Sequence, residues 1–394
     1  MSEGRSAVSL VIVYLGAFIS PLFAARLRVP GAVAEILFGI LVGVSGLGLV
    51  QPAPFTDFLA QLGITFLMFL VGMEIDFNHI RREGFWSVAV AVVVAASILG
   101  MGAVVSHLFG WPPFFALVLG AMSCGILLVA LVETGLQKTR LGQLMLLVGS
   151  VGEFLTLFAL TGFNLVHRFG IGTQLVIEIG RALILFLAAY LMLALLRVLV
   201  WWAPHRFERL VDHHDPSEIG VRAGFVLMLS LANLASLVGM EAILGSFLAG
   251  ALFSFVFRQK EALDAKLSAV GQGFFVPLFF IHVGVSFDRH ALTDPLSVVK
   301  MVLLLAGASL VSKAVPMILL RVLGVPFRQV LAGSFLLSSP LTLLVAVVAL
   351  GKNLGILDQR SSASVILLAI ISGITFPTCF KLLVGSQKKP KPAT

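Results

Sequence analysis

Two side chains of opposite charge interrupt segments that are otherwise apolar. Glu153 lies within the run from Leu141 to Val166, and Lys313 lies deep in the run 295–320. A carboxylate in hydrocarbon has no bulk water, so it must be protonated, be paired or face an aqueous cavity. Opposite charges at that depth tend to find each other, and we therefore expect Lys313 to be the charge partner of Glu153.

A carboxylate that holds either a proton or a metal cation, and is carried to each side of a membrane in turn, is sufficient for antiport. Glu153 is the candidate for this shared site. The alternative is a buried ion pair with a purely structural role, although such pairs are costly and rarely stabilise a protein.

Two further segments contain breaks that can supply oxygen ligands. Residues 122–125, Met-Ser-Cys-Gly, interrupt the run 112–132, and residues 338–340, Ser-Ser-Pro, interrupt the run 329–350. Gly and Pro release carbonyl oxygens from the helical ladder, and carbonyls together with hydroxyls suit a hard cation. Candidate ligands are Ser123, Cys124, Ser338 and Ser339. Each break on its own is equally well explained as a packing kink.

The composition places all of these residues in a membrane protein. Hydrophobic residues make up 59% of the chain and charged residues only 12%, with a mean hydropathy of +1.07. A soluble globule carries about a quarter charged residues. Apolar segments near the ~20 residues that span a bilayer number thirteen: 6–25, 30–49, 57–73, 86–107, 112–132, 141–166, 174–201, 219–239, 241–257, 267–286, 295–320, 329–350 and 362–384.

The placement of basic residues agrees with an odd number of spans. Lys and Arg collect in short cytoplasmic loops. Eighteen lie after odd-numbered segments or in the tail, and five lie on the opposite side. This predicts an N-terminus outside and a C-terminus inside, and it attributes the basic isoelectric point to membrane topology and anionic lipid, with no nucleic-acid partner.

Two segments of similar sequence are expected to cross the membrane in opposite directions. Residues 67–76, which close the third segment, resemble residues 279–288, which close the tenth, and residues 38–41 more weakly resemble 249–252. An offset of seven segments reverses orientation, which is typical of inverted-topology repeats. We therefore expect a first six-helix repeat at 1–168, a connecting helix and cytoplasmic loop at 169–218, a second repeat at 219–384 and a basic cytoplasmic tail at 385–394.

Other polar residues have simpler interpretations. Glu178 and Arg181, three residues apart, are expected to form an interfacial salt bridge. His282, near the end of the tenth segment, is expected to be hydrogen-bonded. Both cysteines lie inside apolar segments, so a disulfide framework or thiolate metal site has no support. We expect a retained first span, no nucleotide-binding domain in this polypeptide, no cofactor and no enzyme activity, since no nucleophile–base pair is present.

Four motifs in order resemble the cation:proton antiporter-2 family, and together they extend over nearly the whole chain. They lie at 26–48, 69–76, 245–250 and 276–284. The resemblance implies crossed broken helices moving against a scaffold, usually in a homodimer, and exchange of Na+ or K+ for H+. Glu153 and Lys313 match the family's carboxylate and basic positions. Gly152 departs from the pattern, because the family places a second polar residue there, and residues 122–125 and 339–342 also differ from it.

The sequence therefore predicts an all-α polytopic membrane protein with the sodium/proton antiporter fold, in the bacterial inner membrane. Its expected function is monovalent cation:proton antiport by alternating access, contributing to pH homeostasis, with one-for-one electroneutral exchange. A separate cytosolic regulatory subunit is a further expected partner. Two alternatives remain open: a sodium-coupled symporter of organic anions, and a non-transporting membrane sensor or subunit.

Overall fold

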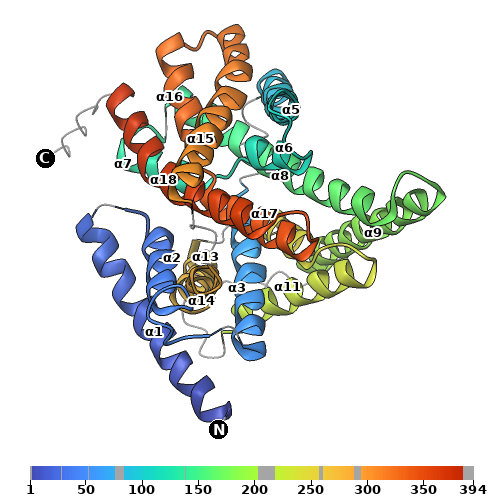
Figure 1. The fold of residues 1–394 in the computed structure, drawn as a ribbon. Helices are drawn as coiled ribbons and strands as arrows, with labels where there is room; N and C mark the ends of the chain where they lie inside the picture. Colours follow the sequence, from blue (N-terminus) through green and yellow to red (C-terminus); the bar gives the residue numbers. More distant parts are fainter. Residues whose placement is uncertain are drawn as a thin grey trace, which may run out of the picture. The chain divides into compact units, whose positions relative to one another are not determined.

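The computed structural model describes residues 2–27, 29–51, 53–75, 84–137, 139–202, 218–256, 261–287 and 294–384. Within these ranges the chain is helical and contains no strand (Figure 1). Among the described residues, ten helices are long and apolar enough to cross a membrane, or eleven if one bent pair is counted as a span. The predicted all-α membrane architecture is confirmed.

Helical structure coincides with all thirteen predicted segments. The first half contains α1 (Ser2–Leu27), α2 (Gly31–Val42), α3 (Pro54–Met73), α5 (Gly84–Leu108), α6 (Phe114–Gly120), α7 (Gly125–Glu133), α8 (Arg140–Phe169) and α9 (Thr173–Trp202). The second half contains α11 (Ile219–Leu237), α12 (Ala242–Val256), α13 (Glu261–Val270), η1 (Gly271–Phe275), α14 (Val276–Val285), α15 (Pro295–Met317), η3 (Ile318–Leu323), α16 (Phe327–Leu337), α17 (Leu341–Asn353) and α18 (Gln359–Val384). Because α2 and α12 have 12 and 15 residues, shorter than the ~20 of a full span, the count of thirteen crossings stays a prediction.

The helices form two compact units, and each unit combines helices from both halves of the chain. Unit 1 comprises Met1–Arg26, Ala34–Asn78 and Thr161–Phe287, and unit 2 comprises Leu27–Val33, His79–Leu160 and Asp288–Thr394. This division by contacts differs from the predicted division into sequence repeats, which stays a prediction. The predicted cytoplasmic loop and basic tail fall largely on residues 203–217 and 385–394, outside the described residues.

In unit 1, helices α2 and α14 touch backbone to backbone. A Cβ atom on Gly39 would lie 2.1 Å from the carbonyl oxygen of Ile281, and one on Gly284 would lie 2.1 Å from that of Ile36. Any side chain at either glycine would collide with main-chain atoms that cannot move aside. The sequence places glycine here because the two helix axes approach too closely for a Cβ atom.

Helices α3 and α12 of unit 1 repeat this arrangement. A Cβ atom on Gly72 would lie 2.1 Å from the carbonyl oxygen of Phe247, and one on Gly250 would lie 2.0 Å from that of Phe69. The two helix pairs are thus built on the same reciprocal glycine contact.

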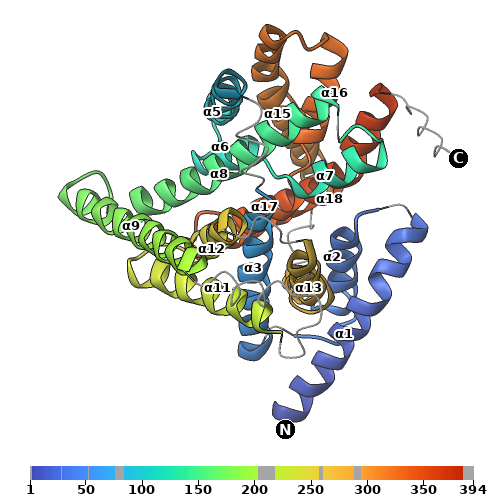
Figure 2. The same ribbon diagram turned by 180° about the vertical axis from the view of Figure 1, so that it is seen from behind.

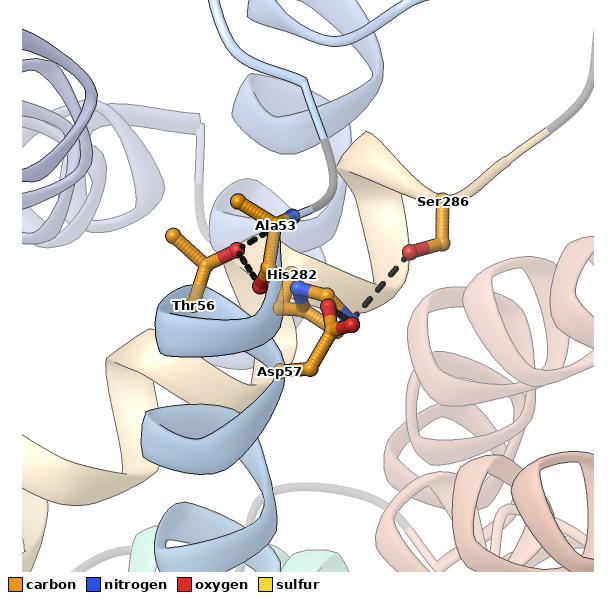
Figure 3. A network of polar contacts seen from close by, with 5 residues as sticks. All are labelled: Ala53, Thr56, Asp57, His282 and Ser286. Atoms are coloured by element: carbon orange, nitrogen blue, oxygen red, sulfur yellow. Dashed lines mark hydrogen bonds and ion pairs between the residues drawn. The ribbon is translucent and has the colours of Figure 1, made fainter. Parts of the chain in front are cut away.

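Polar contacts join α3 and α14 near the start of α3 (Figure 3). Thr56 Oγ1 accepts a hydrogen bond from the Ala53 N–H at 3.0 Å, within the first turn of α3. His282 Nε2 lies 3.3 Å from Ser286 Oγ and 3.5 Å from Asp57 Oδ1. The expected hydrogen bonding of His282 is confirmed.

The predicted pair near the start of α9 is also present in unit 1. Arg181 Nη1 donates to Glu178 Oε1 at 2.7 Å. The Glu178 side chain is 1% exposed and the Arg181 side chain is 54% exposed, so the acid lies beneath the protein surface and the arginine lies on it. The salt-bridge prediction is confirmed.

In unit 2, segments distant in sequence lie side by side. Helix α15 packs against α5 and α16, and α18 packs against α16 and α17 (Figures 1 and 2). Their contacts bury an apolar core that includes Ile98, Met145, Leu336 and Phe380.

At the start of α15, the Asp294 carboxylate accepts a hydrogen bond from the Ser297 N–H at 3.3 Å. This hydrogen bond holds the pKa of the Asp294 carboxyl below its usual range.

Candidate functional site

The first predicted break separates α6 from α7. Helix α6 ends at Gly120, and α7 begins at Gly125. Between them Ala121 is extended, with φ −55° and ψ 134°, and all four intervening residues are buried. The chain therefore leaves the helical ladder in the middle of an apolar segment, and this predicted break is confirmed.

The second predicted break separates α16 from α17. The two helices are bent by 43° across residues 338–340. Pro340, which precedes α17, has no N–H to continue the ladder of α16. This prediction is confirmed as well.

The two breaks meet inside unit 2. Ser123 Oγ, in the first break, lies 3.0 Å from Thr342 Oγ1 in the first turn of α17. Helix α6 contacts α17, and α7 contacts α16. The two broken segments thus contact each other on both sides of their breaks.

Glu153 of α8 binds to the first break. Its Oε1 accepts a hydrogen bond from Ser123 Oγ at 2.9 Å, and its Oε2 accepts one from the Cys124 N–H at 3.2 Å. Cys124 is the residue that precedes α7. A negative charge is therefore placed at the N-terminus of a helix, where the macrodipole and free N–H groups favour it. The side chain is 3% exposed.

Small residues on α8 allow this approach. A Cβ atom on Gly152 would lie 2.5 Å from Met122 Sδ, and one on Gly149 would lie 3.0 Å from Cys124 Sγ. Ser150 Oγ also lies 3.4 Å from Cys124 Sγ. Gly152, which departs from the polar residue of the family motif, thus brings the α8 backbone against the break.

Lys313 of α15 binds to the other end of the same break. Its Nζ is fully buried and donates to the carbonyl oxygen of Leu119, in the last turn of α6, and to Ser309 Oγ at 2.8 Å. A cation at a helix C-terminus is favoured by the macrodipole. Among the described residues, Lys313 forms no ion pair with Glu153. The two charges are instead attached to opposite helix ends of one break.

The remaining predicted ligands differ in their placement. Ser123 and Cys124 contact Glu153 directly. Ser338 Oγ donates to Ser334 O at 2.7 Å, and Ser339 Oγ donates to Leu336 O at 2.7 Å. Both of these hydroxyls therefore bond carbonyls of α16 rather than Glu153.

Three side chains at the junction were missed by sequence reasoning. Thr342, Ser150 and Ser309 each contact a predicted site residue. Helical spacing was an available signal for two of them, since Ser150 is three residues from Glu153 and Ser309 is four from Lys313. Thr342 could have been noted as a hydroxyl in the first turn after a proline break.

The junction suits a monovalent cation. Its oxygen atoms include the Glu153 carboxylate and the hydroxyls of Ser123 and Thr342, and oxygen ligands suit such a cation. In the part of the chain that the structure describes, no group of three or more His, Cys, Asp or Glu residues forms a transition-metal site. A single carboxylate with neutral oxygens provides one negative charge for one positive occupant.

Known proteins match this chain over nearly its whole length. The family model described as "Sodium/hydrogen exchanger, transmembrane" matches residues 14–384. The Bacillus subtilis (strain 168) protein YjbQ, whose name assigns it Na+/H+ antiport, is 32% identical over 98% of this chain and 64% of its own length. The chain therefore spans slightly less than two thirds of that relative.

Two further matches cover nearly the full length of both chains. The Na+/H+-K+ antiporter GerN of Bacillus cereus is 22% identical over 94% of each chain. The solved structure of the sodium proton antiporter MjNhaP1 from Methanocaldococcus jannaschii is similar with a TM-score of 0.66, at 12% identity, over 98% of this chain and 100% of that one. The structural likeness supports the fold.

Proposed function

Because the chain belongs to the sodium/hydrogen exchanger family, we propose that it exchanges Na+ or K+ for H+ by alternating access, with Glu153 as the shared binding site. The names of relatives such as GerN support cation:proton exchange. The observation that carries the residue assignment is the position of the Glu153 carboxylate, buried where two broken helices meet.

Competition at Glu153 follows from its hydrogen bonds. The ionised carboxylate accepts from Ser123 Oγ and the Cys124 N–H. A proton on either oxygen adds a donor and removes the charge that would bind a metal cation. A cation that replaces the proton gains the carboxylate and the adjacent oxygens of Ser123 and Thr342. Only one positive occupant is stabilised at a time, which couples the two fluxes.

Lys313 has a supporting role in this proposal. Its ammonium holds the C-terminus of α6 while the Glu153 carboxylate holds the N-terminus of α7. The break is therefore stabilised by opposite charges at its two ends. Ser338 and Ser339 contribute by bonding α16 carbonyls, which shapes the second break.

The family resemblance and the charge pattern also support a proposal for the assembly and orientation of the protein. The protein acts as a homodimer in the bacterial inner membrane, with its N-terminus outside, and a separate cytosolic subunit regulates it. The alternation of basic loops supports the orientation.

The decisive experiment uses reconstituted vesicles with an internal pH dye, challenged with Na+, Li+ and K+. Wild-type protein gives a cation-driven pH change, and Glu153→Gln reduces it to the level of protein-free vesicles, because a neutral amide cannot exchange a proton. Glu133→Gln is the matched control. Glu133 is 52% exposed and pairs with Lys381, and an exposed pair is worth little, so this variant retains activity within about twofold. Full exchange by folded Glu153→Gln would rule out the assignment.

A single carboxylate also predicts electroneutral exchange. If one cation replaces one proton at Glu153, no net charge moves in a cycle. Turnover at saturating ions is then independent of a membrane potential imposed with a valinomycin-clamped K+ gradient, tested with Na+ as the transported ion. A turnover that rises or falls with the potential would show that a second charge, for example on Lys313, moves in the cycle.

A further inference from the structure

Unit 2 contains a cavity of about 310 Å³ that lies apart from Glu153 and both breaks. Its walls come from the start of α8, the start of α16 and the end of α18, and include Thr139, Arg140, Arg328, Gln329 and Leu383. The volume is at the lower end of the range for small-molecule sites. The charge pattern predicts that this end of unit 2 faces the cytoplasm.

Two arginines lie at unfavourable positions in their own helices. Arg140 is the first residue of α8, and Arg328 is the second residue of α16. A cation at a helix N-terminus is opposed by the macrodipole, and neither helix has an acidic residue in its first turn to compensate. An anion in the cavity would interact favourably with both helix termini and both guanidinium groups at once.

Neither arginine is neutralised within the part of the chain that the structure describes. Arg140 and Arg328 form no ion pair with any described residue, whereas the nearby Lys381 is paired with Glu133. The preference for basic residues in cytoplasmic loops explains how many there are. It does not explain why two from segments nearly 190 positions apart in the sequence line one cavity.

We propose that this cavity binds a phosphate group, presented either by a soluble phosphorylated molecule or by an anionic lipid headgroup. Arginine binds phosphate through two parallel N–H···O bonds, which the planar guanidinium favours. Gln329 offers a further polar side chain, and Leu141 with Leu383 forms an apolar wall for the organic part of the ligand. Because α8 carries Glu153 and α16 leads into the second break, an occupant would hold together the starts of two helices that build the exchange site.

Binding is measured on the full chain in nanodiscs, independently of transport. Inorganic phosphate and ADP are compared with chloride at equal ionic strength in phosphatidylcholine discs, by thermal unfolding. Phosphatidylglycerol is added in a second set of discs without phosphate. Stabilisation in the first set identifies a soluble ligand, and stabilisation in the second set alone identifies the lipid headgroup.

Two sets of variants distinguish binding at this cavity from a general effect of positive charge on the protein. Arg140→Gln with Arg328→Gln weakens the apparent affinity at least tenfold, since each charge-assisted pair is worth about a factor of ten. Arg321→Gln is the control, because Arg321 is also exposed in unit 2 but does not line the cavity, and it retains the wild-type affinity. No stabilisation by any probe, or an equal loss in Arg321→Gln, would overturn the proposal. Because transport plays no part in the readout, this result is independent of the exchange assay.

Discussion

At the scale of single residues, Glu153 and Lys313 stabilise two different helix ends of the same break. Both residues could be singled out as candidates from the sequence, because each is a charge in a long apolar run. The sequence led us to expect that they pair with each other, but among the described residues they do not, because α8 and α15 place the two side chains at opposite ends of the break between α6 and α7. The Leu119 carbonyl bonded by Lys313 has no sequence signature, since every residue has a carbonyl.

Substitution of Lys313 tests whether this residue chiefly bonds the Leu119 carbonyl or chiefly neutralises Glu153. Lys313→Met removes the donor to Leu119 O and Ser309 Oγ and is expected to lower the free energy of unfolding by about 1–3 kcal/mol. Lys313→Gln keeps a donor and loses less. The measurement is chemical or thermal unfolding of the purified protein in detergent.

The control for this prediction is the double variant Lys313→Met with Glu153→Gln. If Lys313 chiefly neutralised Glu153, removing both charges would restore stability. We expect no restoration, because the Leu119 carbonyl still lacks its cation. Recovery of wild-type stability in the double variant would favour the ion-pair role.

At the scale of the elements, both breaks could be located from Gly, Ser and Pro within apolar runs. The sequence could not predict which hydroxyls would reach Glu153 and the first break. Ser338 and Ser339 satisfy carbonyls of their own helix, because serine readily bonds the carbonyl three or four residues back. Thr342, only two residues after Pro340, instead reaches across to Ser123. The choice depends on side-chain directions that are set when α6–α7 and α16–α17 pack together.

The close approach of α8 to the first break is testable with two alanines on one helix. Gly152→Ala places a methyl group 2.5 Å from Met122 Sδ, and we expect overpacking to cost about 1–3 kcal/mol and to reduce exchange. Gly162→Ala has no atom within 4 Å of its new Cβ, so it is expected to be neutral or to stabilise the helix by up to about 1 kcal/mol.

The stability of Gly152→Ala and Gly162→Ala is measured by unfolding, and their exchange activity is measured in the vesicle assay. Adding Met122→Ala to Gly152→Ala is expected to restore part of the loss, since it removes the colliding side chain. Equal behaviour of the Gly152 and Gly162 variants would mean that the contact with Met122 does not determine the position of α8.

At the scale of the whole molecule, the reciprocal glycine contacts of unit 1 support the proposed repeat. The sequence match pairs Gly39 with Gly250 and Gly72 with Gly284. A two-fold operation would therefore convert the Gly39–Gly284 contact of α2 and α14 into the Gly250–Gly72 contact of α12 and α3. Sequence could identify the equivalent positions, but only the structure reveals which helices touch.

The predicted orientation is tested by labelling cysteines from each side of the membrane. In a background with Cys124→Ser and Cys379→Ser, Ser6→Cys is expected to react with a membrane-impermeant maleimide added to intact, suitably oriented cells or spheroplasts. Lys389→Cys is expected to react only after permeabilisation, because an odd number of crossings places the termini on opposite sides. Labelling of both positions from one side would require an even number of spans.

The glycine contacts of unit 1 also have a mechanical consequence. Where main chain rests on main chain, no rotamer can adjust and small displacements are resisted. The two interrupted segments of unit 2 are joined instead by hydroxyl and carboxylate hydrogen bonds, which can be exchanged one at a time. Compliance is therefore concentrated around the Glu153 carboxylate, so that the proposed loading or unloading of a cation there would deform its surroundings while the glycine-packed helices remain stiff.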